Sequence, residues 1–126
     1  MPVDPFDIAW IDEDPLGRQI VHLKSVASAR EKAGKHTGAE HLPEDDIRSV
    51  VTDPDRIDLT TKSPRHREIY YRVSHGRSHP YSRVVVDFDE DRGCPISWSR
   101  YERPVSYMQR VYERDEGAGE DLRDRP

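Results

Sequence analysis

The stretch PEDDIRSVVTDPDRIDLT, residues 43–60, decides the fold, because a helix has to end and a strand has to begin within it. Pro43 suits the first turn of a helix, and the three acidic residues after it favour the positive end of the helix dipole. One apolar face results from three residues at helical spacing: Ile47, Val50 and Val51. Asp53-Pro54 then ends the helix, because a proline pushes the residue before it out of the helical region. The sequence therefore predicts a helix that is followed at once by a strand over residues 56–60.

Beyond this strand the hydrophobic pattern keeps a period of two residues, which is typical of β-structure. Three more such runs follow, and short segments rich in turn-forming residues separate them. These runs cover residues 68–73, 83–88 and 95–100. Because short links between consecutive strands favour antiparallel pairing, we expect a meander of four antiparallel strands.

The N-terminal third predicts a hairpin and a second helix. Residues 6–11 and 18–23 are apolar runs on either side of DEDPLG, which contains the Pro and Gly of a turn. Ser25 can cap a helix that reaches Ala33, and Gly34 is suited to end it.

The C-terminal region predicts one further helix and a tail. Four apolar residues near helical spacing favour a helix over residues 105–113, after Pro104. Residues 117–126 have almost nothing to bury, so an acidic, disordered tail is expected there. The rest, residues 1–116, has the length of a single domain.

These elements predict an α+β domain in which helices pack on one face of a four-stranded antiparallel sheet, with an N-terminal hairpin beside it. Side chains alternate between the two faces of a strand. The apolar sets suit the helix-covered face: Ile69, Tyr71 and Val73, then Val84, Val86 and Phe88, then Ile96 and Trp98. The open face would then carry Tyr70, Arg72 and Arg83, and a ligand is expected there.

The charge distribution favours a local anion site more than a general affinity for nucleic acid. The net charge is −5, which argues against a nucleic-acid coating protein. However, residues 62–83 contain six basic residues and one glutamate, a charge of +5, between ends of −5 (residues 1–16) and −3 (residues 113–126). A positive middle attracts phosphate, unless the acidic ends neutralise it in the folded chain.

Several features favour a cytoplasmic location. No run of about 18 apolar residues occurs, so no membrane span is expected. The acidic N-terminus lacks the basic-then-apolar pattern of a secretory signal. Cys94 is the single cysteine, which suits a reducing compartment and a filler role near a turn.

Five motifs occur in a distinctive order along most of the chain. His36 and His41 are followed by DDIRSVVTDPDRI, REIYYR, VVVDF and PISWSRY. In this order they resemble the phage-associated barnase/EndoU/colicin/RelE-like (BECR) nuclease domains, in which a segment carrying histidine precedes a helix, a Pro-Asp step and three or four strands. Active members of that group resemble metal-independent ribonucleases. The resemblance implies a small endoribonuclease, a toxin or phage-linked effector that acts on RNA and is held in check by a protein inhibitor or antitoxin.

Metal-free RNA cleavage requires a base for the 2′-hydroxyl, an acid for the leaving oxygen and cations for the phosphate. Histidine titrates near neutral pH, and arginine donates two hydrogen bonds to phosphate. The predicted catalytic residues are His36, His41, Arg72 and Arg83. The predicted substrate-binding residues are Tyr70, Arg67, His75, Ser97 and Ser99; the two serines stand where BECR members often have a threonine.

Each of these residues also has an ordinary structural interpretation. Histidines before a helix are about as often caps or turn residues, and the arginines can pair with acids across the strands. His36 and His41 are five residues apart, about 140° around a helix, so a zinc pair is disfavoured and no metal or cofactor is expected. The alternative function is a non-catalytic protein-binding module of the same fold.

Overall fold

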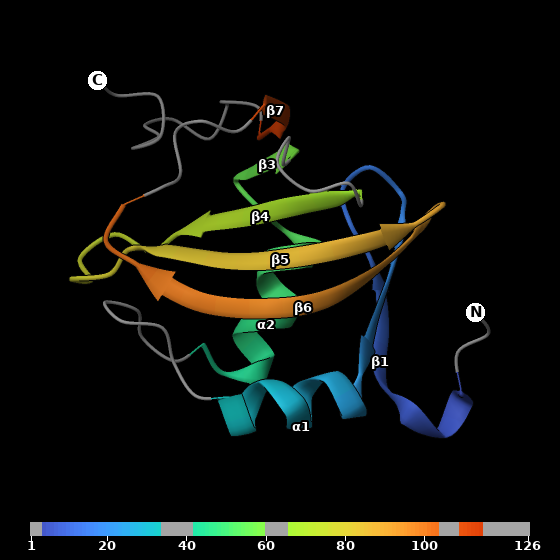
Figure 1. Cartoon of the computed structure of the whole chain (residues 1–126). Coiled ribbons are helices and arrows are strands. Elements are labelled where there is room, and N and C mark those ends of the chain that lie inside the picture. The colour runs from blue at the N-terminus through green and yellow to red at the C-terminus, as the bar shows by residue number, and fades with distance from the viewer. Residues whose placement is uncertain (1–3, 34–41, 60–65, 104–108, 115–126) are drawn as a thin grey trace.

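The computed structural model describes residues 4–33, 42–59, 66–103 and 109–114, and these form one mixed sheet with two α-helices (Figure 1). The strand order in the sheet is β1-β2-β6-β5-β4-β3-β7. The strands are β1 (Ile8–Glu13), β2 (Gln19–Leu23), β3 (Arg56–Leu59), β4 (Arg67–Val73), β5 (Tyr81–Asp89), β6 (Arg92–Tyr101) and β7 (Gln109–Glu113). The helices are α1 (Lys24–Ala33), α2 (Glu44–Thr52) and the short 3-10 helix η1 (Pro5–Asp7).

The helix predicted from the opening stretch is confirmed as α2, and Pro43 is its N-cap residue. Its three apolar residues, Ile47, Val50 and Val51, are buried against the sheet. The chain leaves the helix at Asp53, whose N–H donates to the Ser49 carbonyl at 3.0 Å. Strand β3 begins three residues later, as expected. The predicted helix after β2 is also confirmed, as α1.

The prediction of a four-stranded antiparallel sheet is wrong. The N-terminal hairpin β1–β2 does form, but it joins the same sheet through a short parallel pairing of β2 with β6. This pairing brings Gln19 opposite Arg92 and Ile20 opposite Gly93. Hydrogen bonding between segments about 70 residues apart leaves no local pattern in the sequence, so the hairpin looked like a separate unit.

The prediction of a helix over residues 105–113 is wrong for residues 109–113, which are the part that the structure describes. Gln109–Glu113 forms β7, which pairs antiparallel with β3 and extends the sheet to seven strands. In so short a segment, apolar residues fit a helical and a strand period equally well. Pairing with the open side of β3 satisfies backbone groups that would otherwise form a free edge.

The hydrophobic core lies between α2 and one face of the sheet, whereas Figure 1 shows no helix in front of the other face of β4, β5 and β6. Tyr70, Val84 and Trp98 are paired in register across these three strands and belong to the core cluster. The side chains of β5 and Trp98 of β6 therefore face the core as predicted. In β4 the core-facing and outward-facing residues are exchanged. Tyr70 faces α2 and Tyr71 faces away. Alternation could not predict this choice, because either aromatic ring can be buried.

A polar cluster attaches the β1–β2 turn to β4. Arg18 donates two hydrogen bonds to Glu68, at 2.8 and 2.7 Å, and its Nε donates to Asp14 at 2.9 Å. The Tyr70 hydroxyl donates to Asp14 at 2.6 Å. Burial, followed by the hydrogen bond to Asp14, raises the pKa of Tyr70 well above its usual value. The cluster holds the hairpin over the helix-covered side of the sheet.

No helix in the described part of the chain is long and apolar enough to cross a membrane. The predicted tail, residues 117–126, lies outside the described residues.

Candidate functional site

One face of the sheet is covered by none of the helices in the described residues, and we call it the helix-free face. It carries a row of residues from four strands. Arg56 of β3 pairs with Tyr71 of β4, Tyr71 with Arg83 of β5, and Arg83 with Ser99 of β6. A second row beside it contains Ile69, Val85 and Ser97. Residues paired in register point to the same face of a sheet. Four predicted site residues therefore share the helix-free face: Arg67, Arg83, Ser97 and Ser99.

Arg83 differs from the other two arginines on this face. Arg56 donates to Asp58 at 2.6 Å, and Arg67 lies 3.8 Å from Asp87. Arg83 makes no ion pair within the described residues, and its buried Nε has no hydrogen-bond acceptor there. Its guanidinium instead lies 3.9 Å above the ring of Tyr101. Stacking orients the guanidinium but leaves its positive charge unneutralised, so Arg83 can accept an anion.

Two predicted residues, Tyr70 and Arg72, do not reach the helix-free face. Arg72 pairs in register with Ser82, so it points to the side of α2. There it lies 3.3 Å from the Asp53 carboxylate and donates to the Asp53 and Ser49 carbonyls. The expectation that Tyr70, Arg72 and Arg83 lie together is wrong, because the register between β4 and β5 separates them.

The predicted histidines do not meet the arginines within the described structure. His36 and His41 lie outside the described residues. His75 lies in the loop between β4 and β5, where it is exposed. Of the four predicted catalytic residues, the helix-free face therefore contains Arg83, whereas Arg72 lies on the opposite face.

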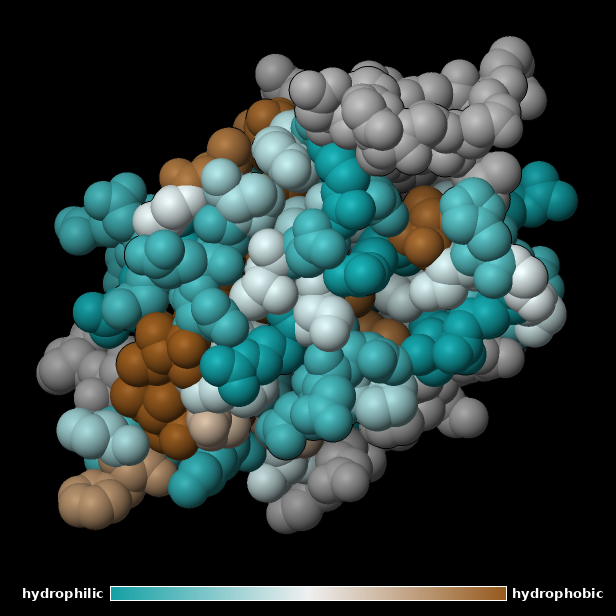
Figure 2. All heavy atoms as spheres, turned by 180° about the vertical axis from the view of Figure 1, so that it is seen from behind, coloured by the Kyte–Doolittle hydropathy of each residue, from teal (hydrophilic) through white to brown (hydrophobic). Residues whose placement is uncertain are grey.

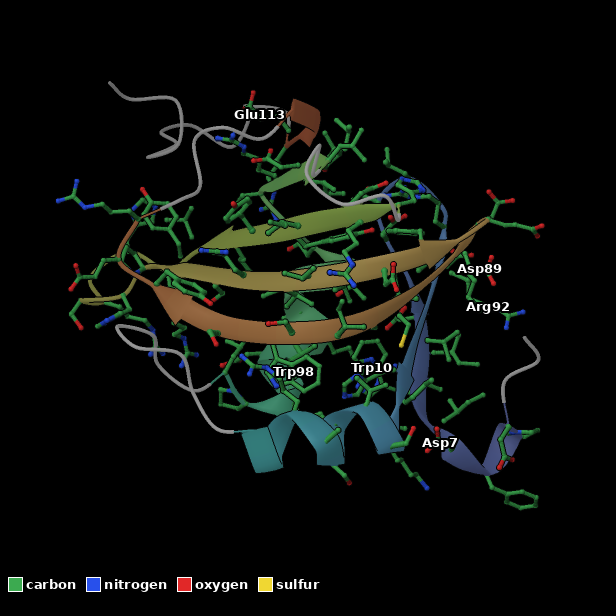
Figure 3. All side chains as sticks on the ribbon, in the orientation of Figure 1. Asp7, Trp10, Asp89, Arg92, Trp98 and Glu113 are labelled. Atoms are coloured by element: carbon green, nitrogen blue, oxygen red, sulfur yellow. The ribbon has the colours of Figure 1, made fainter. Side chains whose placement is uncertain are left out.

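Sequence reasoning missed a buried histidine. His22 of β2 is completely buried between Trp10 and Trp98, with ring centroids 5.1 and 5.2 Å away. Figure 3 shows these two tryptophans between β6 and α1. Neither ring nitrogen has a hydrogen-bond partner among the residues that the structure describes, and Glu44 lies 3.6 Å from Nε2. Burial, opposed in part by Glu44, lowers the pKa of His22, so the ring is neutral at physiological pH.

A second missed histidine belongs to the polar cluster. His66 Nε2 lies 2.7 Å from Glu68, whose two oxygens also receive the hydrogen bonds of Arg18. The rings of His66 and Phe88 lie 5.3 Å apart, and Arg18 stacks over Phe88 at 4.2 Å. With these partners in place, the cluster is a structural connection between the β1–β2 turn, β4 and β5. Alternation alone gave no signal for it, because Arg18 and Glu68 are 50 residues apart.

Metal and thiol chemistry have little support in the described residues. They contain no group of three or more His, Cys, Asp or Glu placed to hold a metal ion. The Cys94 thiol is partly buried, and burial followed by the charge of Asp87 raises its pKa to about 11. Because the thiolate is the nucleophilic form, Cys94 is unsuited to catalysis at neutral pH.

Comparisons with protein-family models, curated proteins and solved structures find no match to this chain. The resemblance to BECR nuclease domains therefore remains a hypothesis that rests on the motifs.

Proposed function

We propose that this protein binds RNA through its helix-free face and cleaves it without a metal ion. The proposal depends on the environment of Arg83, whose guanidinium has no acidic partner in the described residues and stacks on the Tyr101 ring. Ser97, in the next row of the same face, is an additional polar residue, whereas the Ser99 hydroxyl is buried and donates to the Trp98 carbonyl at 2.6 Å. Tyr81 and Tyr101 pair in the neighbouring row of the same face, and aromatic rings are the usual platforms for unpaired bases.

The proposed reaction uses residues from two regions of the chain. Arg83 would bind the scissile phosphate and stabilise the negative charge that develops in the transition state. His36 and His41 remain the proposed base and acid, which take the 2′-hydroxyl proton and protonate the leaving 5′-oxygen. Arg72 is no longer part of this proposal, because it contacts Asp53 beside α2.

The first experiment compares two arginines on neighbouring strands. Fluorescence anisotropy measures the affinity of a labelled single-stranded RNA for wild type, Arg83→Ala and Arg72→Ala. Loss of a charge-assisted contact is expected to weaken binding about tenfold or more in Arg83→Ala. Arg72→Ala is expected to bind like wild type. Equal binding by all three proteins would refute the RNA-binding proposal.

The second experiment tests cleavage separately. RNA is incubated with the protein in EDTA, and the products are separated on a denaturing gel. His36→Ala or His41→Ala is expected to abolish cleavage while RNA binding persists. Intact RNA with wild-type protein, despite normal binding, would reduce the function to RNA binding alone.

A second candidate function is protein binding at the β1 edge. Three of the four large hydrophobic residues exposed in the described structure lie on or beside β1: Phe6, Ile11 and Leu16. Figure 2 shows apolar atoms gathered on the side of the molecule where β1 ends the sheet. Acidic residues accompany this edge, notably Asp4 and Glu13. The fitting partner is therefore an extended segment with alternating apolar and basic residues, since a second copy would bring like charges together.

A synthetic peptide of alternating Val and Lys tests this candidate, with a Val and Glu peptide as control. The basic peptide is expected to protect β1 amides from hydrogen exchange, and Ile11→Asp is expected to prevent that protection. Equal protection by both peptides, or none, would exclude this kind of partner.

A further inference from the structure

The two tryptophans of the chain enclose an ionisable side chain. The His22 ring is completely buried; Trp10 stacks on it with the ring planes 28° apart, and Trp98 meets it edge-on at 71°. Neither nitrogen of the ring has a hydrogen-bond partner among the described residues. Protonation would make both nitrogens donors, and a buried cation with unsatisfied donors is costly. Stacking on indole offsets part of this cost, but the N–H bonds lie in the plane of the imidazole ring and still meet no acceptor.

One carboxylate of the described residues faces this ring. Glu44, at the start of α2, lies 3.6 Å from Nε2, beyond hydrogen-bond distance, and its side chain is 59% exposed to the solvent that screens its charge. The arginines of the elements around His22 bond elsewhere: Arg48 to Asp12, Arg100 to Asp46, and Arg30 to Ser99. The described charges therefore give a protonated His22 one weak counter-ion.

Strand β1 is the least constrained member of the stack. It is the outermost strand on its side of the described sheet, and its pairing with β2 is irregular between Ile8 and Trp10. Trp10 is partly buried, whereas Trp98 belongs to the core of the sheet. A further contact of Trp10 is the guanidinium of Arg48, whose side chain is itself half exposed. Separation of Trp10 from His22 would therefore bring water to one face of the imidazole while the core stays packed.

We propose that the Trp10–His22–Trp98 stack is an acid-sensitive switch, in which protonation of His22 releases Trp10 and the beginning of β1 from the sheet. A ring that water reaches has the usual pKa of 6.5, whereas burial lowers the pKa of His22 in the closed structure. The open form therefore binds a proton more readily, and opening becomes more favourable as the pH falls below about 6.5. The turn at the other end of the hairpin stays in place, because Arg18 holds it on Glu68.

Amide hydrogen exchange between about pH 5 and pH 7.5 measures the release strand by strand, after correction for the intrinsic pH dependence of exchange. The protection factors of β1 amides are expected to fall below pH 6.5, by at most about tenfold per pH unit for one proton. At pH 5 this exchange should be insensitive to low urea concentrations, because local opening exposes little surface. Amides of β5 should exchange through global unfolding and accelerate with urea.

Three variants test the role of His22 and its counter-ion. His22→Phe keeps an aromatic ring but cannot titrate, so β1 protection should no longer depend on pH. Glu44→Gln removes the counter-ion of the closed form, and β1 protection at pH 5 should fall further, by up to about fivefold. Asp45→Asn is the matched control, because it removes an exposed acid from the same turn of α2 and should behave like wild type.

Fluorescence gives a second measurement of the release. In Trp98→Phe, Trp10 is the only tryptophan, and acrylamide should quench it more efficiently at pH 5 than at pH 7.5. The switch would be overturned if β1 lost protection with pH equally in His22→Phe and wild type. It would also be overturned if β1 amides showed the same urea dependence as those of β5, since the acid effect would then be global. If the thermal midpoint shows that His22→Phe does not fold, His22→Gln replaces it.

Discussion

Arg72 and Arg83 lie on neighbouring strands but on opposite faces of the sheet, because Arg83 pairs with Tyr71 and Arg72 pairs with Ser82. The two cations therefore have different environments. Arg72 contacts the end of α2 through Asp53, while Arg83 stacks on Tyr101 without an acidic partner in the described residues. This separation limits the proposed RNA site to the helix-free face. Contacts elsewhere in the molecule determine the stability of the sheet and can be tested separately.

The ion pair of Arg18 with Glu68 is expected to contribute strongly to stability. Arg18→Met leaves the carboxylates of Glu68 and Asp14, which are 3% and 0% exposed, without their cation. Removing one partner of a buried pair costs about 3–5 kcal/mol. Urea unfolding followed by circular dichroism measures the loss.

The control for this prediction is Arg48→Met. Arg48 also pairs with an aspartate and stacks on an aromatic ring, but its side chain and that of Asp12 are 50% and 39% exposed. Exposed pairs contribute at most about 1 kcal/mol. Similar losses in Arg18→Met and Arg48→Met would show that burial does not strengthen the Arg18 pair.

His22 is expected to make stability depend on pH below neutrality. Burial between the tryptophans lowers the pKa of His22 in the folded chain from its usual 6.5, so the unfolded chain binds a proton more readily. The stabilising effect is complete above about pH 6.5 and is lost as the pH falls towards the folded-state pKa. In this window, each unit by which the pH falls lowers the free energy of unfolding by at most about 1.4 kcal/mol.

His22→Phe provides the comparison, because an aromatic ring still fills the space between Trp10 and Trp98. The free energy of unfolding is measured by urea titration between about pH 5 and pH 8. The wild-type value should fall more steeply than that of His22→Phe below pH 6.5, with Glu44 intact in both. Parallel curves for the two proteins would contradict a buried neutral histidine.

Gly93 is expected to tolerate no side chain. A Cβ at this position would lie 2.6 Å from Val86 Cγ1 and 2.9 Å from the Phe88 ring, both of which belong to the core. Gly93→Ala should therefore destabilise the protein by about 1–3 kcal/mol through overpacking. Thermal denaturation measures the effect.

Gly76→Asn is the matched control for Gly93→Ala. Gly76 has φ of +86°, and a Cβ there would meet nothing within 4 Å. Asparagine tolerates this left-handed conformation better than most residues, so the loss should stay below about 1 kcal/mol. A larger loss at position 76 than at position 93 would contradict the packing argument.

The Cys94 thiol is expected to react slowly at neutral pH. Its pKa is raised to about 11 by burial and by Asp87, so very little thiolate is present near pH 7. Reaction with a disulfide reagent should be much faster for the urea-unfolded chain than for the folded chain. A rapid reaction of the folded protein at pH 7 would indicate an accessible, activated thiol.

Local chemistry alone determined several elements of this protein. Pro43 and the Asp53-Pro54 step set the ends of α2, and the spacing of Ile47, Val50 and Val51 set its buried face. The hairpin, α1 and the strands from β3 to β6 were also predicted, because capping, turn chemistry and period two act over a few residues.

Only the tertiary structure decided which face of β4 meets the helix and which arginines lie together. Period two states that Tyr70 and Tyr71 point in opposite directions, but both rings are buried and either can face the core. Register, the parallel pairing of β2 with β6, and the contact of Arg30 with Ser99 depend on segments far apart in the chain. Such contacts are selected by packing and hydrogen bonding of the whole sheet, and no local pattern records them.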